Sequence, residues 1–291
     1  MGKIYCMSDI HGFDQPFCQR MSQLGKFHTV FTGEDTLVLL GDYIDGGPRS
    51  KPLLTLISDL QQCYGEHCIV LRGNHEEDFL AWLDAYAGPG AGQRDEYGLF
   101  PYHPWLDTDT DFQTFRSFVT EKQWAHFQKV LPTLSEDSLN TLAAQMVMES
   151  NAELIAWLRG LPYYYETERQ IFVHAGIDEE SGDLWRYGTE ERVFVGKHPA
   201  TMGPFEKDII AGHNGTHTLM GDPDFHDILW DGENHYFCDG TAWKSGKLPV
   251  LVYDTDTGKY YALGDEGLHP VARCPKEQVE KWKGETAGDW F

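Results

Sequence analysis

The chain has 291 residues and a formal net charge of −23, with 46 acidic against 23 basic residues. Nucleic acids and anionic membranes are bound by clustered Lys and Arg, so this balance argues against both as partners. No stretch approaches the roughly 20 apolar residues of a membrane span, and no signal peptide is recognisable, so we expect a cytoplasmic protein. An anionic substrate must then be attracted locally, by a group such as a metal ion.

The first third of the chain alternates between apolar runs of strand length and segments in which apolar residues have helical spacing. Apolar runs of strand length occur at 4–7, 37–40 and 69–71. Helical spacing follows at about 14–24, 50–60 and 79–83, with Asp14 and Ser50 as the expected N-caps. This order of strands and helices predicts a largely parallel, buried sheet.

Residues 88 to 160 interrupt that order. They combine a glycine-rich loop with helical spacing and many aromatic residues, which predicts a helical insertion. Ser150 and Glu153 fit a capping box, so we expect a helix to begin there. The insertion's tryptophans, Trp105, Trp124 and Trp157, are expected in the core. The insertion is expected to lie beside the site and select substrates, or else to cover an edge of the sheet.

Strands return after residue 161, mostly without helices between them. They are predicted at 163–165, 171–173, 208–211, 235–238, 250–253 and 259–263. We therefore expect an α/β fold in which two sheets form a βαβ sandwich flanked by helices, as one domain over residues 1–265. Residues 266–291 form a polar tail that the pattern does not assign.

Metal-ligand residue types follow five of these strands. They are Asp9 and His11, Asp42 and Asp45, Asn74 and His75, His174, and His213. Ligands of an open α/β sheet bind beyond the carboxyl ends of its strands, so these side chains are expected to converge. Oxygen and imidazole ligands without cysteine suit manganese, iron or catalytic zinc. One shared carboxylate would hold two ions about 3.5 to 4 Å apart, as two-metal hydrolases require.

The motifs Asp9-Ile10-His11-Gly12, Gly41-Asp42-Tyr43-Ile44-Asp45, Gly73-Asn74-His75-Glu76, His174-Ala175-Gly176 and Gly212-His213 resemble, in this order, the signatures of calcineurin-like metallophosphoesterases. GDYID and GNHE resemble the bacterial serine/threonine phosphoprotein phosphatase branch. The resemblance implies two divalent ions, manganese first, with iron or zinc as alternatives.

The resemblance also implies a role for each residue. Asp9 and His11 would hold the first ion, Asp42 would bridge, and Asn74, His174 and His213 would hold the second. His75, hydrogen-bonded to Asp45, would protonate the leaving alcohol, while Asn74 also neutralises phosphoryl oxygens. A hydroxide bridging the ions would attack phosphorus in line, without a covalent intermediate.

The sequence departs from the family where an arginine that binds the substrate phosphate usually follows Asp45. Gly46 and Gly47 stand there instead. Arg49 is one candidate replacement, with a solvated helix-entry residue as the alternative interpretation. A second family arginine follows a tryptophan after the HAG motif, and Arg186 resembles it slightly better than Arg192 does.

The leading functional expectation is a phosphomonoesterase, with phosphoserine or phosphothreonine in proteins as one substrate class. The alternative enzyme hydrolyses small phosphorylated molecules or dinucleoside polyphosphates, because diadenosine tetraphosphatases share the ligand pattern. A non-catalytic metal-binding module is the third hypothesis. The presence of both Asp45 and His75 argues against it, because such a module would need neither.

Overall fold

The structure is a computed structural model that describes residues 2–25, 35–89, 91 and 103–284. Its first sheet has the order β11-β10-β9-β1-β2-β3. The strands are β1 (Lys3–Met7), β2 (Thr36–Leu39), β3 (Cys68–Val70), β9 (Val250–Asp254), β10 (Lys259–Gly264) and β11 (Gly267–Pro270). As predicted, β1, β2 and β3 run parallel, while β9, β10 and β11 pair antiparallel.

The second sheet has the order β12-β7-β8-β6-β5-β4 and is mixed, as expected. Its strands are β4 (Tyr164–Glu166), β5 (Gln170–Val173), β6 (Asp208–Ala211), β7 (Leu229–Trp230), β8 (His235–Phe237) and β12 (Ala272–Arg273). The central strands β5, β6 and β8 are parallel. Parallel neighbours need crossover connections, so short helices intervene where few were predicted. These are α8 (Trp185–Gly188), α9 (Glu191–Gly196) and α10 (Thr216–Met220), with α11 (Ala242–Ser245) before β9.

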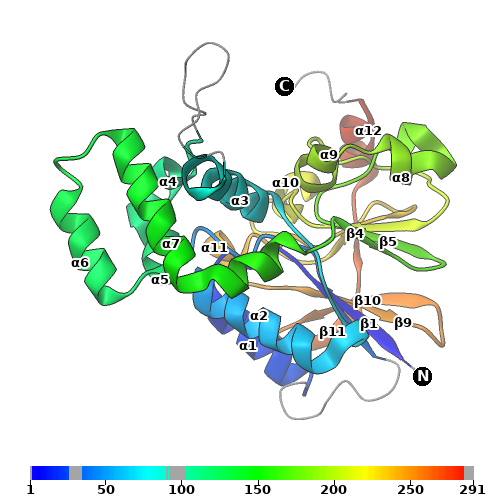
Figure 1. Ribbon diagram of the computed structural model, residues 1–291. Coiled ribbons are helices and arrows are strands. Elements are labelled where there is room, and N and C mark those ends of the chain that lie inside the picture. The colour runs from blue at the N-terminus through cyan, green and yellow to red at the C-terminus, as the bar shows by residue number, and fades with distance from the viewer. Residues whose placement is uncertain (1, 26–34, 90, 92–102, 285–291) are drawn as a thin grey trace.

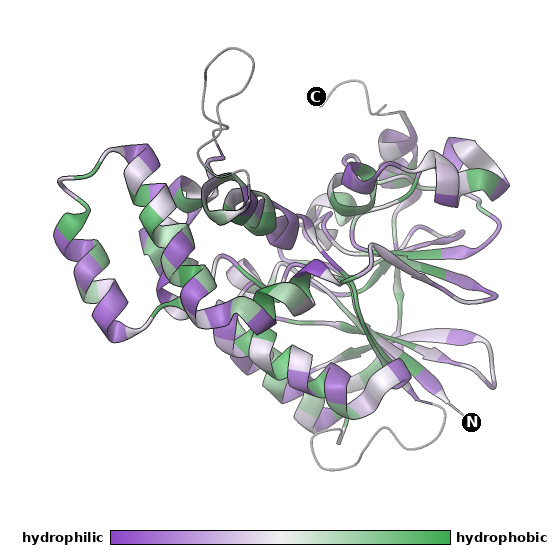
Figure 2. Cartoon of the chain, in the orientation of Figure 1, coloured by the Kyte–Doolittle hydropathy of each residue, from purple (hydrophilic) through white to green (hydrophobic). Residues whose placement is uncertain are grey.

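The two sheets stack face to face and are covered by helices on their outer faces (Figure 1). Apolar side chains from both sheets, among them Val38 and Leu40 of the first and Phe172 and Ile210 of the second, form the core between them. The predicted α/β sandwich is confirmed. Hydrophilic and hydrophobic residues alternate along α2 and α7, so these helices turn one apolar side inward (Figure 2).

Three helices follow the first three strands, as the spacing predicts. They are α1 (Asp14–Gln23), α2 (Ser50–Tyr64) and α3 (Asn74–Ala87). The N-caps of α1 and α2 are Phe13 and Arg49, one residue before the predicted Asp14 and Ser50. Neither side chain makes a capping hydrogen bond. Asp14 lies in the first turn of α1 and binds Arg49 instead.

The insertion is helical, as predicted, and forms a lobe beside α3 (Figure 1). It contains α4 (Trp105–Thr108), α5 (Gln113–Phe118), α6 (Glu121–Val130) and α7 (Glu136–Arg159). The glycine-rich loop at its start lies mostly outside the described residues. The helix expected to begin at Ser150 is the second part of α7, in which two helical segments meet at a kink at Asn151 (φ −140°), one residue later than predicted. The Asn151 amide there donates to the carbonyls of Phe118 and Val147, which offsets the interrupted helix bonding.

The segment after residue 265, which the pattern leaves unassigned, joins both sheets. Its strand β11 pairs with β10 and its strand β12 pairs with β7. The following helix α12 (Lys276–Gly284) buries Trp282 against the outer side of the second sheet. No helix within the described ranges combines the length and apolarity needed to cross a bilayer.

A buried ionic group ties β8 to the crossover that follows β5. The His235 side chain is 3% exposed, and its Nδ1 lies 3.3 Å from Asp231 Oδ2. Its Nε2 lies 3.6 Å from an oxygen of Glu179, which also pairs with Lys197. Burial lowers the pKa of His235, but the two carboxylates more than offset this and raise it. The charged form of the His235 imidazole is therefore more stable in the folded protein than in the unfolded chain.

Because the pKa of His235 is raised on folding, its stabilisation is present below the ordinary pKa of about 6.5 and is lost as pH rises through the folded-state value. We expect His235→Gln to lower the free energy of unfolding near pH 6 by about 1.5 to 3 kcal/mol. We expect the free energy of unfolding of His235→Gln, measured with urea, to differ less between about pH 6 and about pH 9 than that of wild type. His126→Gln, at an exposed site on α6, is the control, and an unchanged dependence in His235→Gln would contradict the assignment.

Candidate metal centre

The predicted ligand residues meet at the carboxyl ends of β1, β2, β3, β5 and β6. A cavity of about 390 Å³ opens there. It is lined by Asp9, His11, Asp42, Gly46, Asn74, His75, His213, Asp239 and Trp243. His174 lies behind this wall, fully buried. The structure thus brings together all six residues for which the sequence predicts metal binding.

Tight backbone turns place these side chains. Five site residues have left-handed backbone conformations with φ between 52° and 67°: Asp9, His11, Asp42, Asp45 and His213. Two glycines allow neighbouring strand ends to approach. A Cβ on Gly73 would lie 2.2 Å from Asp42 Oδ1, and one on Gly212 would lie 2.3 Å from Asp9 Oδ2. Any side chain at these two positions would push a ligand away.

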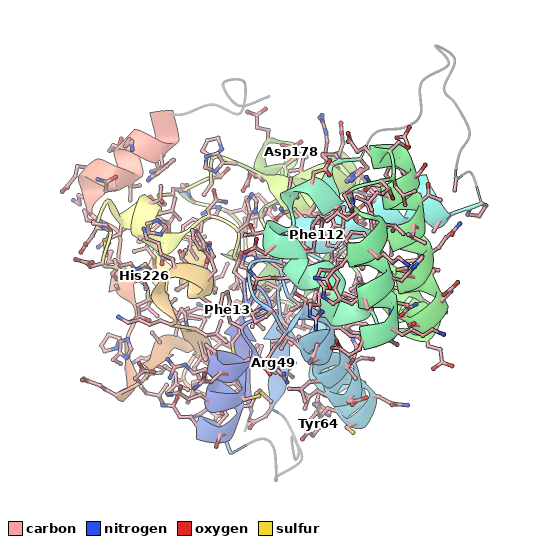
Figure 3. The ribbon with its side chains drawn as sticks, turned by 90° about the vertical axis from the view of Figure 1, so that its left-hand side faces the viewer. Phe13, Arg49, Tyr64, Phe112, Asp178 and His226 are labelled. Carbon is pink, nitrogen blue, oxygen red and sulfur yellow. The ribbon has the colours of Figure 1, made fainter. Side chains whose placement is uncertain are left out.

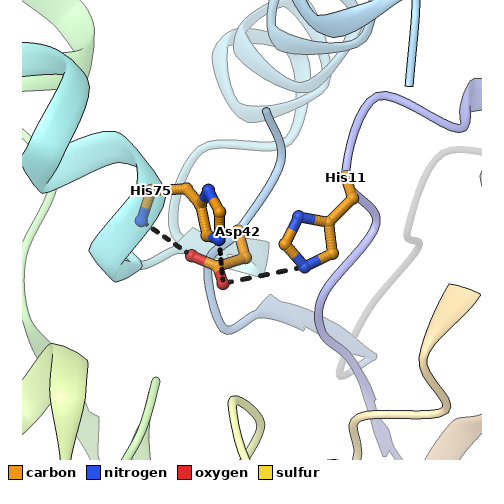
Figure 4. Close-up of side chains that lie close together, drawn as sticks. All are labelled: His11, Asp42 and His75. Carbon is orange, nitrogen blue, oxygen red and sulfur yellow. Dashed lines mark hydrogen bonds and ion pairs between the residues drawn. The ribbon is translucent and has the colours of Figure 1, made fainter. Parts of the chain in front are cut away.

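His11, Asp42 and His75 form the first group of possible ligands (Figure 4). His11 Nε2 lies 3.8 Å from Asp42 Oδ2 and 3.9 Å from Asp9 Oδ1. Its Nδ1 is 3.1 Å from the Ile44 carbonyl, which fixes Nδ1 as the protonated nitrogen of the neutral ring. Nε2 then presents a lone pair toward the two carboxylates, as a metal-binding imidazole does.

Asp42, His174 and His213 form the second group. Asn74 joins them, because its Oδ1 lies 3.0 Å from both His174 Nε2 and His213 Nδ1. Burial lowers the pKa of His213, and the neighbouring His174 lowers it further, to about 3. His213 therefore remains neutral, which is the form that binds a metal.

The two groups fit a pair of divalent ions. They share Asp42, and within each group the ligand atoms lie within 4.8 Å of one another. Burial opposes ionisation of Asp42, but His174, His75 and His11 together hold its pKa below the usual range. Carboxylate, amide and imidazole atoms converge here, and a cation would satisfy their lone pairs together. This donor set suits ions of borderline hardness.

His75 occupies a different position from the other imidazoles. Its Nδ1 lies 2.8 Å from Asp45 Oδ2, while its Nε2 faces the cavity, 3.9 Å from Asp42 Oδ2. Burial lowers the pKa of His75, but Asp42 and the hydrogen-bonded Asp45 raise it to about 10. A protonated imidazole with one nitrogen bound to a carboxylate and the other in the cavity is arranged to donate a proton.

The predicted phosphate-binding arginines lie elsewhere. Arg49 Nε is 2.5 Å from Asp14 Oδ2, beside the start of α2 (Figure 3). Arg186 pairs with Glu166, and the alternative Arg192 pairs with Glu190. None of the three lines the cavity. In this structure each of these guanidinium groups pairs with a nearby carboxylate outside the cavity.

Four further residues belong to the site, although the sequence analysis gave them no role in it. They are Glu76, Asp239, Trp243 and Trp105. The Glu76 carboxylate accepts backbone hydrogen bonds from the loop after β2, Asp239 and Trp243 line the cavity, and Trp105 binds Asp45. Glu76 stands inside the GNHE motif, which was a usable signal. Trp105 was expected in the core and is buried, but its N–H contact depends on tertiary structure.

Two relatives match parts of the chain in sequence. Over 210 residues the chain is 24% identical to a symmetrical bis(5'-nucleosyl)-tetraphosphatase of Nitrosococcus oceani, covering 72% of this chain and 54% of that protein. Over 73 residues it is 34% identical to a Caenorhabditis elegans protein whose name provisionally assigns it to the serine/threonine-protein phosphatases, covering 25% and 19%. The chain thus spans about half of the first relative and less of the second.

A mutant cold-active protein tyrosine phosphatase has a similar fold, with a TM-score of 0.55 at 13% identity, over 92% of this chain and 80% of that one. Residues 2–244 match the sequence profile described as calcineurin-like phosphoesterase. This match covers most of the chain and all of the predicted ligands. The chain therefore belongs to the calcineurin-like phosphoesterase family.

Proposed function

We propose that the chain is a dinuclear-metal phosphomonoesterase. The observation that carries the proposal is that two groups of ligand-type residues share Asp42 on one cavity, where His75, which belongs to the first group by distance, is bound by Asp45. Asp9 and His11 would hold one ion, and Asn74, His174 and His213 the other. The ions, manganese first and iron or zinc as alternatives, supply charge to polarise the phosphoryl group and to lower the pKa of water.

The protein's own groups supply the rest of the reaction. Backbone N–H groups hold two of the carboxylates: the backbone N–H of His75 donates to Asp42 Oδ1, and that of His213 donates to Asp9 Oδ2. These contacts keep both carboxylates in place without movement during turnover. His75 would transfer the proton of its cavity-facing Nε2 to the departing ester oxygen. Asp45, on Nδ1, would then stabilise the ring's orientation through the transfer.

Phosphorylated serine or threonine in a protein is the first substrate class that we propose. The test is a panel of phosphopeptides, nitrophenyl phosphate and diadenosine tetraphosphate, assayed with manganese, iron and zinc. Turnover of phosphopeptides and nitrophenyl phosphate supports the phosphomonoesterase. Selective turnover of the dinucleotide supports the second candidate, and no turnover with any metal would overturn both.

Hydrolysis of nucleotide-containing phosphoesters is the second candidate. Trp243 favours it, because this tryptophan lines the cavity while 59% exposed. An exposed aromatic ring offers a stacking surface for a base. No arginine lines the cavity among the described residues, so a substrate held partly by its base fits the lining. The N. oceani relative is named for such a substrate.

The shared carboxylate gives a direct test of the metal count. Asp42→Asn should abolish turnover and lower the bound metal, because the amide removes the negative charge that both ions would share. Elemental analysis of the purified proteins, together with the assay, measures both. Asp84→Asn, which affects only a surface pair with Arg159, is the matched control. Full activity in protein that binds one ion or none would refute the dinuclear centre.

His75→Ala should slow hydrolysis of alkyl phosphates by about 10²- to 10⁴-fold, the range of general acid catalysis. Nitrophenyl phosphate should be affected far less, since its good leaving group needs little protonation. Steady-state rates on the two substrates give the comparison, with metal content measured alongside. Equal losses of rate on alkyl phosphates and on nitrophenyl phosphate would show that His75 is not the proton donor.

Trp243→Ala distinguishes the two substrate classes. If a base stacks on this ring, the substitution should reduce kcat/KM for diadenosine tetraphosphate by about tenfold or more, since such stacking is worth about 1 to 3 kcal/mol. The rate on nitrophenyl phosphate should change little, and Trp243→Tyr should retain most of the dinucleotide activity. Equal kcat/KM for the dinucleotide in wild type and Trp243→Ala would show that Trp243 binds no base.

A further inference from the structure

The carboxylate that holds His75 is itself held by only a few contacts. Asp45 Oδ2 accepts two hydrogen bonds, from His75 Nδ1 at 2.8 Å and from Trp105 Nε1 at 3.0 Å. Asp45 Oδ1 is buried and makes no hydrogen bond within the described part of the chain. Apart from the contact with His75, Trp105 is therefore the hydrogen-bond donor that fixes the Asp45 side chain.

Trp105 comes from the helical insertion, not from the sheets that supply the ligands. It begins α4, is 3% exposed, and packs with ring centroids 4.7 Å from Phe79 and 4.8 Å from Trp82. Both partners lie on α3, the helix whose first residues are Asn74 and His75. The indole N–H is thus held in a rigid aromatic cluster and directed at Asp45.

The rest of the insertion supports this cluster. The Trp82 indole donates to Asn140 on α7 at 2.7 Å, and α3 packs along α7. On its other side, the His75 ring meets the His11 ring edge-on, with centroids 4.8 Å apart. His75 is consequently bounded by a metal-site imidazole on one side and by a carboxylate that the insertion orients on the other.

We propose that Trp105 is a positioning residue for proton donation: its indole N–H orients the Asp45 carboxylate, which orients His75 toward the leaving group. The inference rests on the proposed phosphomonoesterase function. It makes the insertion part of the catalytic apparatus, whereas the sequence analysis expected a substrate-selecting cap or padding for the sheet. Without the N–H, Asp45 Oδ2 loses one of its two hydrogen-bond donors, and the ring that it holds gains rotational freedom.

Trp105→Phe keeps an aromatic ring in the cluster but removes the indole N–H together with the five-membered part of the ring. It should reduce kcat for an alkyl phosphate by about tenfold, a part of the general acid contribution, and leave kcat for nitrophenyl phosphate within about twofold. KM and metal content should not change. Trp157→Phe is the matched control, since it loses an indole hydrogen bond, to Gln61, elsewhere in the insertion without touching Trp105 or Asp45. In an Asp45→Ala background, Trp105→Phe should have no further effect on the ratio of the two rates.

A second readout does not require turnover. In metal-free protein labelled with ¹⁵N-histidine, the Nδ1–H resonance of His75, assigned by its loss in His75→Ala, should shift or broaden in Trp105→Phe and remain in Trp157→Phe. An unchanged resonance, or equal rate losses on both substrates, would overturn the positioning role. If wild type hydrolyses no phosphomonoester, the proposed function fails, and the resonance still decides whether Trp105 orients the Asp45–His75 pair.

Discussion

The site depends above all on one buried carboxylate that binds no substrate. Glu76 is fully buried, and its two oxygens accept backbone N–H groups from Asp42 and Tyr43 at 2.8 Å, Ile44 at 3.1 Å and Gly73 at 3.0 Å. Burial raises its pKa, and Asp42 raises it further, to about 7, while the backbone donors act in the opposite direction. The loop that carries the shared ligand and the helix that carries Asn74 and His75 are thereby joined at one point.

This joint allows the ligand loops to adopt conformations that the chain would otherwise avoid. A left-handed conformation costs a non-glycine residue about 1 to 2 kcal/mol, and five site residues adopt it. That cost is a large part of the net stability of a typical domain, about 5 to 15 kcal/mol. It has to be offset away from the site, by the core between the sheets and by the aromatic core that joins α3 to the insertion. Strain is thus concentrated where five strand ends approach one another.

The predictable part of the site is the part that short-range pattern determines. His174 directly follows an apolar run and Asp42 follows one after a single glycine, and the topology of parallel strands then brings the ends of these strands together. Arg49 was not predictable in the same way, because a guanidinium reaches several ångströms and its position depends on Asp14, which is distant in sequence. For Trp105, the sequence predicted burial in the core. It could not predict that the indole N–H donates to Asp45, because this contact depends on how the insertion packs against α3.

The lining of the cavity has a consequence for how this protein attracts an anionic substrate. No lysine or arginine lines the cavity within the described residues, and the whole chain carries a formal charge of −23. Under the proposed function, attraction of a phosphoester would therefore fall to the metal ions and to the imidazolium of His75, because the negative field of the surrounding protein repels an anion. An arginine after Asp45 would add a permanent positive charge, whereas Gly46, with a left-handed φ of 82°, adds none and lies close to His11 and Trp243. Under the proposed function, the site therefore has an aromatic ring but no fixed positive side-chain charge in its described lining, and recognition would rest more on the group that the phosphate is attached to than on the phosphate itself.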